Sequence, residues 1–437
     1  MDWEKFLFSL SRFGIKLGLG PTEQFAYSLG NPQNQFRSVH IGGSNGKGST
    51  STFIYEILKK KYRAGLYTSP HLRTFNERII VDDIPIDSDF IEKFTKSQHS
   101  KIIYNDSLTQ LTFFEYTTVM AFKYFQERGV EFASIEVGLG GRLDSTNIIN
   151  PEASVITSIS LEHADKLGGK IEDISREKGG IIKSGKPIVL GKMPDSAKSI
   201  LRNIAKERRS PIREVDDCNI TNLEYSLNGT SFDLQTEMDK YKIKLRALGE
   251  HQVTNATSAI LAYESISSGI GKDVAVEALR ETVIPGRFEI RSRKPLMILD
   301  GAHNSEASHL LVRNIRRYNI KNPLIIIGLL RDKNSYNILQ NLSEVSDSVV
   351  VTEPNEKERK KDSDDLRKEA SFFFKEIEVS KTPKEALNIA VKSGRDTIIT
   401  GSLYLVGEME VLLDERMRSK KVPVEKNFIP ENEGSVE

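Results

Sequence analysis

Short apolar runs alternate with longer stretches of helical periodicity along the first half of the chain. The apolar runs predict buried strands at 37–42, 63–68, 132–137, 153–157 and 186–190. Between them, apolar residues recur at helical spacing, most clearly over 113–128. Strands that alternate with helices in this way indicate βαβ units and a mainly parallel sheet.

The segment 213–247 breaks this alternation. Asn228 and Gly229 stand between two extended runs, and this residue pair is a strong signal for a β-hairpin. We therefore expect a small antiparallel insert at this point. A helix is expected to follow it, from about His251 to Ser268.

A second alternating series begins after the turn pair Pro285 and Gly286. Its predicted strands lie at 296–300, 324–328, 348–352, 376–379 and 397–400, and its predicted helices near 305–317, 335–343, 363–374, 383–392 and 404–416. We expect two domains, residues 1–284 and 285–437, of which the second is an open, Rossmann-like α/β domain. The charge-mixed run 355–365 between two of these elements is expected to be a solvated surface segment.

Composition narrows the class of protein. The 437 residues carry 62 Lys and Arg against 61 Asp and Glu, and this balance argues against nucleic acid or an anionic membrane surface as the main partner. The one cysteine, Cys218, excludes an intramolecular disulfide and a cysteine-based metal cluster within one chain. Neither a secretory signal nor a membrane-spanning run is evident, so we expect a cytoplasmic protein.

A glycine-rich segment between a predicted strand and a predicted helix carries the sharpest chemical signal. It reads His-Ile-Gly-Gly-Ser-Asn-Gly-Lys-Gly-Ser-Thr from His40 to Thr50. Glycines let backbone N–H groups approach an anion, and the helix N-terminus adds partial positive charge. We therefore expect a P-loop in a P-loop ATPase-type domain, with nucleotide contacts from Gly43, Ser44, Asn45, Gly46, Lys47, Gly48 and Ser49.

The match to the P-loop pattern is imperfect at one position. Gly48 follows Lys47, where the pattern has a serine or threonine whose hydroxyl ligates Mg²⁺. Either Ser49 takes over this role or the metal is held elsewhere. The alternative interpretation of the segment is a glycine-rich turn that binds nothing.

The P-loop and nine further blocks together resemble one family. Gly43-Ser-Asn-Gly-Lys-Gly-Ser49 is similar to the phosphate loop of the Mur ligase superfamily, and the glycine after the lysine resembles its folylpolyglutamate synthase/dihydrofolate synthase branch. The other blocks follow in family order: Thr68-Ser-Pro-His-Leu72, Phe75-Asn-Glu-Arg-Ile79, Glu136-Val-Gly-Leu-Gly-Gly-Arg-Leu-Asp144, Glu162-His163, Arg176-Glu-Lys-Gly-Gly-Ile181, Gly249-Glu-His-Gln252 with Asn255, Pro285-Gly-Arg-Phe-Glu289, Asp300-Gly-Ala-His-Asn304 and Gly401-Ser-Leu-Tyr404.

The resemblance implies an ATP-dependent ligase that joins L-glutamate to a carboxylate of a folate or pteroate. The carboxylate would take the γ-phosphoryl group to become an acyl phosphate, and the glutamate amine would then displace phosphate. Folate contacts would come from the loop after Thr68 and from Phe75–Arg78. Pro21 stands where relatives often carry a charged residue, so this part of the pterin wall is not assigned.

The resemblance also implies two Mg²⁺ sites. Ser69, Glu136 and His163 match the family's metal ligands, and Ser69 would compensate for Gly48. A carboxylate after a strand suits Mg²⁺, which prefers oxygen ligands, whereas imidazole is a less usual ligand for this ion. From the residues alone, Ser69 reads as a turn serine, Glu136 as a structurally paired carboxylate and His163 as a structural hydrogen-bonding group.

The remaining roles rest on the resemblance as well. Lys178 matches a lysine that is often carbamylated by CO₂ in the superfamily; otherwise it would be a surface helix lysine. The family's pattern assigns catalytic roles to Lys47, His163, Lys178, Asp300 and His303, nucleotide contacts to Asn255, Arg287 and Asp300, and glutamate contacts to His303 and Ser402. A structural pair of His251 and Asn255, one helical turn apart, is the alternative for Asn255.

Two other functions stay open at this point. One is a Mur-type amide ligase that acts on a different carboxylate acceptor, and the other is a nucleotide-binding regulator without chemistry. The sequence does not distinguish folylpolyglutamate synthase from dihydrofolate synthase or a bifunctional enzyme. We expect a monomer that binds neither nucleic acid nor a membrane.

Overall fold

The computed structural model describes residues 2–14, 16, 18–104, 111–161, 167–266, 268–356 and 359–419. Contacts divide the chain into two compact units. The first comprises Met1–Glu289 and Ser305–Lys321, and the second comprises Ile290–Asn304 and Asn322–Glu437. The division is therefore not a single cut, because one helix that connects two strands of the second unit is grouped with the first.

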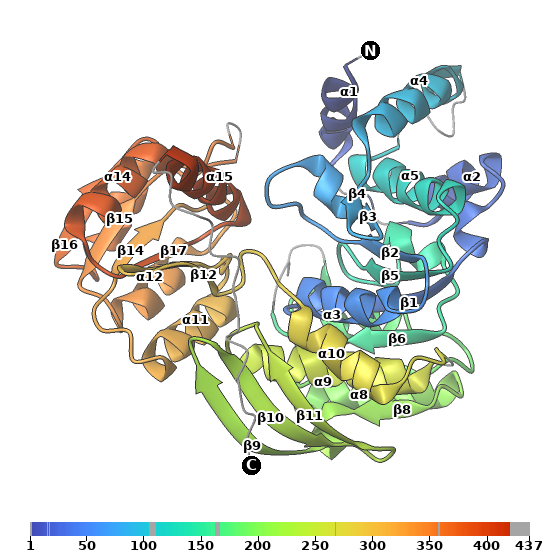
Figure 1. Cartoon of the computed structure of the whole chain (residues 1–437). Helices are drawn as coiled ribbons and strands as arrows, with labels where there is room; N and C mark the ends of the chain where they lie inside the picture. Colours follow the sequence, from blue (N-terminus) through green and yellow to red (C-terminus); the bar gives the residue numbers. More distant parts are fainter. Residues whose placement is uncertain are drawn as a thin grey trace. The chain divides into compact units, whose positions relative to one another are not determined.

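An eight-stranded sheet forms the centre of the first unit (Figure 1). Its strands lie in the order β4 (Ile84–Pro85), β3 (Ile79–Val81), β2 (Ala64–Tyr67), β5 (Phe132–Glu136), β1 (Arg37–Gly42), β6 (Ala153–Ile156), β7 (Ile188–Leu190) and β8 (Ile212–Glu214). The strands from β2 to β8 pair in parallel, whereas β3 and β4 add an antiparallel edge. All five strands predicted here are present, and the largest difference is at 186–190, where β7 begins at Ile188.

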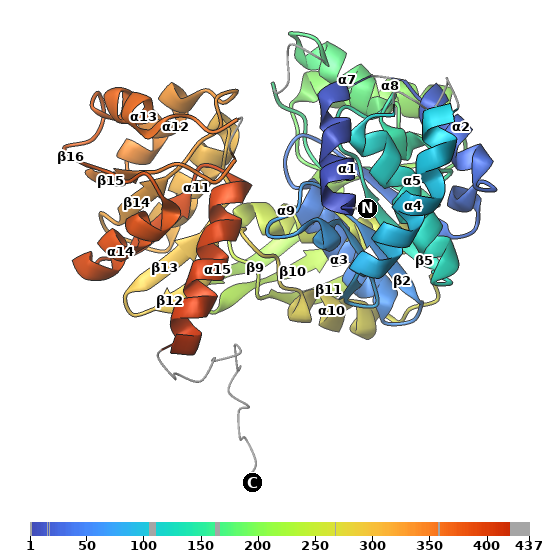
Figure 2. The same cartoon turned by 90° about the horizontal axis from the view of Figure 1, so that it is seen from above.

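Helices cover both faces of this sheet, as Figure 2 shows from above. Alternate residues of a strand point to opposite faces, so Phe132 of β5 joins one core while Ala133 and Ile135 join another. The helices of the unit are α1 (Trp3–Ser9), α2 (Gly20–Ser28), α3 (Lys47–Lys59), α4 (Ser88–Tyr104), α5 (Phe113–Glu127), α7 (Ile171–Gly179), α8 (Asp195–Glu207), α9 (Glu250–Ser265), α10 (Lys272–Glu281) and α11 (Ser305–Arg317).

The predicted hairpin is present and gains a third strand. β9 (Asn219–Ser226) pairs antiparallel with β10 (Gly229–Gln235), and β10 pairs with β11 (Lys240–Leu245). One face of this small sheet is buried through Phe232, Leu234, Tyr241 and Ile243, which share a core with α3, α9 and α10. The insert therefore packs into the same core as the helix that begins at the P-loop.

A six-stranded sheet forms the second unit, in the order β12 (Glu289–Arg293), β13 (Leu296–Leu299), β17 (Thr397–Thr400), β14 (Leu324–Ile327), β15 (Ser348–Val351) and β16 (Glu376–Val379). The strands from β13 to β16 pair in parallel. The four central strands β13, β17, β14 and β15 are fully buried, as their apolar sequences predict. The helices of this unit are α12 (Ser335–Ser343), α13 (Ser363–Ala370), α14 (Pro383–Ser393) and α15 (Leu403–Ser419).

One local expectation for the second unit needs adjustment, and another falls partly outside the described residues. The helix predicted over 363–374 ends at Ala370, because the following residues turn and the N–H groups of Lys375 and Glu376 donate to Asp347 O as β16 begins. Of the run 355–365, residues 357–358 lie outside the described residues, and Lys360 forms an isolated bridge with Leu330. Among the residues that the structure describes, no helix has the length and apolar character needed to cross a lipid bilayer.

Candidate functional site

The predicted P-loop connects β1 to α3 at the carboxyl edge of the first sheet. β1 ends at Gly42, α3 begins at Lys47, and β1 lies between β5 and β6 in the centre of the parallel strands. Ligands of open α/β sheets bind at this edge, outside the carboxyl ends of the strands. The strand, loop and helix expected of a P-loop are therefore in place.

Two loop glycines adopt conformations that other residues reach only with strain. Gly43 has φ 139° and Gly46 has φ 88°. A Cβ atom at Gly43 would lie 2.0 Å from Thr157 Oγ1, and one at Gly46 would lie 2.5 Å from Asn255 Oδ1. Conformation and close packing both require glycine at these two positions.

Two lysines converge on the same carbonyl oxygen of the loop. Lys47 Nζ donates to Gly43 O and Ser44 O, at 3.0 Å each, and Lys178 Nζ donates to Gly43 O at 2.8 Å. Lys178 comes from α7 and is 2% exposed, so the reading of this residue as a surface lysine is wrong. The structure thus brings both predicted catalytic lysines to the loop.

Glu136 supplies a buried carboxylate next to the loop. It ends β5, is 4% exposed, and its Oε2 accepts the N–H of Ser69 at 3.0 Å. Burial raises the pKa of the Glu136 carboxyl, while the Lys47 charge and the Ser69 N–H act in the opposite direction. A Cβ atom at Gly48 would lie 3.6 Å from Glu136 Oε2, so the missing side chain at this position leaves space beside the carboxylate.

These oxygen donors fit a magnesium ion better than a transition metal. A carboxylate and a serine hydroxyl are hard ligands, and Ser69 and Glu136 meet at the carboxyl ends of the neighbouring strands β2 and β5. The described residues contain no group of three or more His, Cys, Asp or Glu side chains with metal-binding geometry. His163, the third predicted ligand, lies outside the described residues.

A chain of side-chain amides connects α9 to the start of α3. Asn255 Nδ2 donates to Gln252 Oε1 at 3.0 Å, and Gln252 Nε2 donates to Ser49 Oγ at 3.4 Å. Asn255 is 5% exposed and its carboxamide contacts Gly46, as the close approach of its oxygen indicates. Sequence reasoning gave Gln252 no role, although it belongs to one of the blocks that carry the family resemblance.

The strand β6 supplies two residues that sequence reasoning missed. Thr157 Oγ1 donates to Asn45 O at 2.7 Å, and Ser158 Oγ donates to the same oxygen at 3.0 Å while accepting the Asn45 N–H at 2.9 Å. They follow the carboxyl end of β6, next to β1. Two polar residues directly after a buried parallel strand are the sequence signal that could have identified Thr157 and Ser158 as site residues.

Asp144 holds the turn that follows Glu136. Its buried carboxylate accepts the N–H groups of Gly138 and Leu139 at 3.1 and 2.9 Å and that of Thr146 at 2.9 Å. Thr146 Oγ1 in turn lies 2.8 Å from the Nε2 atom of His40, a fully buried residue of β1. Burial lowers the pKa of His40 to about 3, so this imidazole is neutral at physiological pH.

Arg287 contributes charge to this region, while its guanidinium donates to the adjacent Gly286 O at 3.4 Å. It is half-buried, and its charge favours the ionised form of Glu136. Burial, together with the charge of Arg287, lowers the pKa of His251 to about 4. His251 and Asn255 lie one turn apart on α9, but the contact of Asn255 is with Gln252 and not with His251. The alternative structural pair is therefore absent from the described contacts.

In the second unit, the residue predicted to bind the ribose, Asp300, and those predicted to bind glutamate, His303 and Ser402, follow strands at the carboxyl edge of the sheet. Asp300 follows β13 and accepts the N–H of Ala302 at 2.9 Å, and His303 Nδ1 lies 2.8 Å from Gly301 O. Ala302 O accepts the N–H of Gly401, which follows β17. The loop with Asp300 and His303 thus contacts the loop that leads to Ser402.

Ser402 is placed by the helix that it precedes. Its hydroxyl accepts the N–H of Leu405 at 3.1 Å, as an N-cap residue of α15 does, and the residue is 2% exposed. Gly401 has φ 106°, and a Cβ atom there would lie 2.7 Å from Gly328 O, at the end of the adjacent strand β14. The loops that follow β13, β17 and β14 therefore contact one another next to Ser402.

Comparisons with known proteins give the same assignment for most of the chain. Residues 41–263 match the Mur ligase middle domain, and residues 286–402 match the domain described as Mur ligase, glutamate ligase domain. The chain is 35% identical to the dihydrofolate synthase/folylpolyglutamate synthase of Bacillus subtilis, over 93% of this chain and 97% of that protein.

Solved structures agree with the sequence comparisons. A folylpolyglutamate synthase from Thermotoga maritima is 34% identical, with a TM-score of 0.84 over 95% of this chain and 97% of that one. A FolC structure from E. coli in complex with DHPP and ADP is 26% identical, with a TM-score of 0.84 over 95% of this chain and 98% of that one. Each of these relatives therefore matches both the P-loop domain and the second α/β domain of the predicted fold.

Proposed function

Because the chain belongs to the folylpolyglutamate synthase/dihydrofolate synthase family of the Mur ligases, we propose that it joins L-glutamate to a carboxylate of a folate or pteroate, using ATP. The observation that carries this proposal is the phosphate loop with Lys47 and Lys178 on Gly43 O, beside the buried carboxylate of Glu136. An acid-activating ligase needs this combination, because the transferred phosphoryl group must be held by backbone N–H groups, cations and a metal ion.

The reaction proceeds through two displacements. The acceptor carboxylate attacks the γ-phosphorus of ATP, the bond to the β-phosphate oxygen breaks, and an acyl phosphate and ADP form. The deprotonated amine of glutamate then adds to the acyl carbon, and phosphate leaves to give the amide. Lys47 lies within reach of the loop that cradles the phosphates, so its ammonium offsets charge that develops on the transferred group.

Magnesium would be held by oxygen ligands at the ends of β2 and β5. Ser69 and Glu136 fit this role because both carry side-chain oxygens and the Ser69 N–H donates to Glu136 Oε2, while the Glu136 carboxylate lies beside Gly48. The ion supplies charge that offsets the phosphates of the nucleotide. His163 as a ligand and a second Mg²⁺ site stay predictions from the family's pattern.

Nucleotide and amino-acid roles complete the proposal. In this proposal, Asn255 and Arg287 bind the nucleotide and Asp300 binds its ribose. His303 and Ser402 bind the incoming glutamate. Support for the glutamate assignments comes from the contact of the two loops that carry these residues, through Ala302 O and the N–H of Gly401. The relative solved with DHPP and ADP supports a pterin-containing acceptor and an adenine nucleotide for this chain as well.

A carbamate on Lys178 would place an anion next to the phosphate loop. The Lys178 ammonium donates to Gly43 O and is nearly fully buried. Intact mass measured in the presence and absence of bicarbonate tests this part of the proposal. A Lys178→Ala variant that short carboxylates reactivate would support the carbamate, and a variant with wild-type activity without them would contradict an essential role.

A substrate panel tests the function itself. Dihydropteroate and tetrahydrofolate are offered separately with ATP, Mg²⁺ and radiolabelled glutamate, and the product mass is read out. Label in the dihydropteroate product indicates dihydrofolate synthase activity, label in the tetrahydrofolate product indicates folylpolyglutamate synthase activity, and label in both indicates a bifunctional enzyme. No transfer to either acceptor would refute the folate assignment and favour a Mur-type ligase with another carboxylate acceptor.

Location and assembly stay predictions. We propose that the chain is a monomer and that it acts in the cytoplasm. Light scattering of the purified chain tests the monomer, and fractionation of the source cells tests the location.

A further inference from the structure

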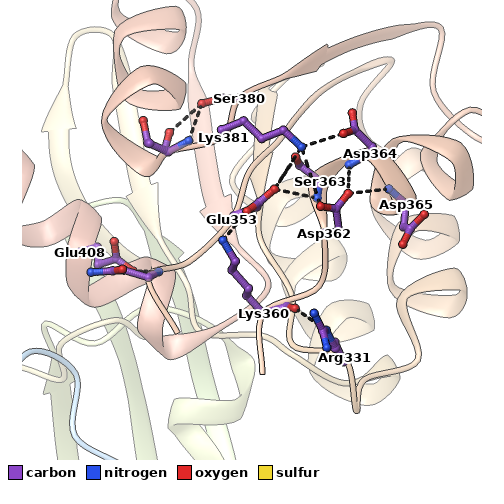
Figure 3. A network of polar contacts seen from close by, with 12 residues as sticks. Arg331, Glu353, Lys360, Asp362, Ser363, Asp364, Asp365, Ser380, Lys381 and Glu408 are labelled. Atoms are coloured by element: carbon purple, nitrogen blue, oxygen red, sulfur yellow. Dashed lines mark hydrogen bonds and ion pairs between the residues drawn. The ribbon is translucent and has the colours of Figure 1, made fainter. Parts of the chain in front are cut away.

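One buried carboxylate in the second unit has no role in the function proposed so far. Glu353 follows β15 and is 6% exposed. Its two oxygens accept hydrogen bonds from Lys360 Nζ at 2.6 Å, from Ser363 N and Oγ at 3.2 and 2.8 Å, and from Lys381 Nζ at 3.3 Å (Figure 3). A carboxylate inside a protein is costly unless charges and donors compensate it, and here both do.

The partners of Glu353 come from three different segments. Lys360 lies in the connection between β15 and α13, Ser363 is the first residue of α13, and Lys381 lies between β16 and α14. Burial alone would raise the pKa of Glu353, but the hydrogen bonds from Lys360, Ser363 and Lys381 outweigh it and lower this pKa to about 2. The carboxylate therefore stays ionised and joins the connection between β15 and α13 to the connection between β16 and α14.

Two surface carboxylates, Asp362 and Asp364, also pair with Lys381, the more exposed of the two lysines that contact Glu353. Lys381 Nζ also pairs with Asp364 at 2.7 Å and Asp362 at 3.8 Å, and Asp362 Oδ1 accepts the N–H of Asp364 as the N-cap of α13 (Figure 3). These outer pairs are solvent-exposed, so each is worth little. The hydrogen bonds from Lys360, Ser363 and Lys381 all end on the Glu353 carboxylate, which is therefore the centre of the network.

The segment that carries Glu353 contacts the surroundings of Ser402. A Cβ atom at Gly328 would lie 3.0 Å from both Thr352 O and Pro354 Cδ, and 3.2 Å from Leu405 Cδ2. On the other side, the N–H of Asn355 donates to Glu408 Oε1 at 2.6 Å. Thr352–Asn355 is thus packed against the end of β14 and bonded to α15.

The same helix α15 begins directly after Ser402. Ser402 Oγ accepts the N–H of Leu405, and Gly401 packs on Gly328 O. A shift of Thr352–Asn355 would therefore reach Ser402 through two contacts, one at Gly328 and Leu405 and one at Glu408. Glu353 itself does not contact Ser402 in the described hydrogen bonds.

We propose that Glu353 is a positioning residue for the amino-acid substrate: by holding Lys360, Ser363 and Lys381, it keeps Thr352–Asn355 against Gly328 and α15 and so maintains the geometry at Ser402. This inference rests on the proposed function, because it assigns Ser402 to glutamate. It predicts an effect on glutamate binding and none on the nucleotide or on the chemical step.

Steady-state kinetics of Glu353→Gln test the proposal. The change keeps the shape of the side chain and removes its charge. We expect the KM for glutamate to rise about tenfold, while kcat and the KM for ATP stay close to those of the parent. Lys381→Met, which removes one of the donors, should raise the same KM less.

The matched control is Asp347→Asn, at the other end of β15. Asp347 pairs with Lys375 at 2.9 Å on the surface, so this variant also replaces an acid by its amide and breaks an ion pair. It should leave the KM for glutamate unchanged. Amide hydrogen exchange of the peptide that contains Thr352–Asn355 gives a readout that does not require activity, and we expect faster exchange in Glu353→Gln only.

The outcomes separate this inference from the proposed function. A parent enzyme that transfers glutamate, combined with an unchanged KM in Glu353→Gln, overturns the positioning role. An equal loss of kcat with all substrates shows general damage and overturns it too. A parent that transfers no glutamate to any folate refutes the proposed function instead, and the exchange measurement then decides whether Glu353 holds the segment.

Discussion

Both units place polar residues at the carboxyl edge of a parallel sheet, but they hold them in different ways. Around the P-loop, side chains of Lys47, Lys178, Thr157 and Ser158 contact main-chain atoms of the loop. In the second unit, the segment Thr352–Asn355 is held by two lysines, Lys360 and Lys381, which come from two connections and meet at the Glu353 carboxylate.

The difference shows which kind of site can be recognised from the sequence. A site built from main-chain atoms requires particular backbone conformations, and these require glycine at fixed positions such as Gly43 and Gly46. A segment held by ion pairs can be built from many combinations of acids and lysines. A single substitution in the P-loop should therefore cause a large loss of activity, whereas a single substitution around Glu353 should cause only a partial loss.

Loss of the Lys47 ammonium should have the largest effect. Lys47→Ala removes one of the two ammonium groups that lie on the phosphate loop, and we expect kcat to fall about a hundredfold or more. Product formation in the panel described above measures it. Lys60→Ala is the matched control, because Lys60 is the C-cap residue of the same helix and pairs with Glu281 on the surface. Normal product formation by Lys47→Ala would remove the P-loop from the mechanism.

Gly43→Ala should come next, because it combines strain with a collision. Its Cβ would meet Thr157 Oγ1, so we expect a destabilisation of about 3 kcal/mol and loss of ATP affinity. Gly185→Ala is the control for strain alone, since Gly185 has φ 70° and no atom within 4 Å of an added Cβ. It should cost about 1 kcal/mol and leave ATP affinity unchanged.

Calorimetry of unfolding and titration with ATP separate the two glycine variants. Equal destabilisation in both would mean that the contact with Thr157 relaxes without cost. Retained ATP affinity in Gly43→Ala would mean that the nucleotide does not depend on the loop conformation. Either result would weaken the contrast between a backbone-built site and one held by side chains.

The same contrast explains what could be predicted from the sequence. The family and the ligase class predicted from the ordered blocks are confirmed, as is the mixed α/β fold class. Apolar runs identified the central strands because strands buried on both faces have few polar residues. The short edge strands β3, β4 and β8 were not predicted, since two or three residues carry too little pattern.

Helices at the start of the chain were missed for a related reason. α1, α2 and α4 pack aromatic residues against α5, as in the ring contacts of Phe25 with Tyr116 and Phe94, but their apolar positions are interrupted by polar ones. At the site, Gln252, Thr157 and Ser158 were missed although each has a local signal, because their partners Ser49 and Asn45 are distant in sequence. The local signal marks these residues as candidates but does not name the partner.

Ser402→Ala should have a moderate effect with two separable parts. The hydroxyl caps α15, so its loss should cost about 1 kcal/mol of stability. If Ser402 also contacts glutamate, the KM for glutamate should rise about tenfold. Thr382→Ala is the control, because Thr382 caps α14 in the same unit and should lower stability equally without changing this KM. An equal KM in the two variants would leave Ser402 with a structural role alone.

The smallest expected effect concerns the pH dependence of the Glu353 network. The pKa of Glu353 is about 2 in the folded chain, below its ordinary value of 4.5, so its contribution to stability is complete above pH 4.5 and is lost as the pH falls toward 2. The free energy of unfolding of Glu353→Gln should therefore lie below that of the parent at pH 7, and the two should converge on acidification. The difference should be on the order of 1 kcal/mol, since Lys360 and Lys381 are partly exposed and solvent screens their charges.

The readout has to come from the second unit. The one tryptophan, Trp3, lies in the first unit, so its fluorescence does not report on Glu353. Methyl signals of the isoleucines in β13 and β14, followed through urea titrations at pH 7 and at a pH near the folded-state pKa of about 2, measure the difference directly. If the difference in free energy of unfolding between parent and variant stays constant with pH, the carboxylate charge does not stabilise these connections. The carboxyl edge of the second unit's sheet would then depend on packing at Gly328 rather than on ion pairs.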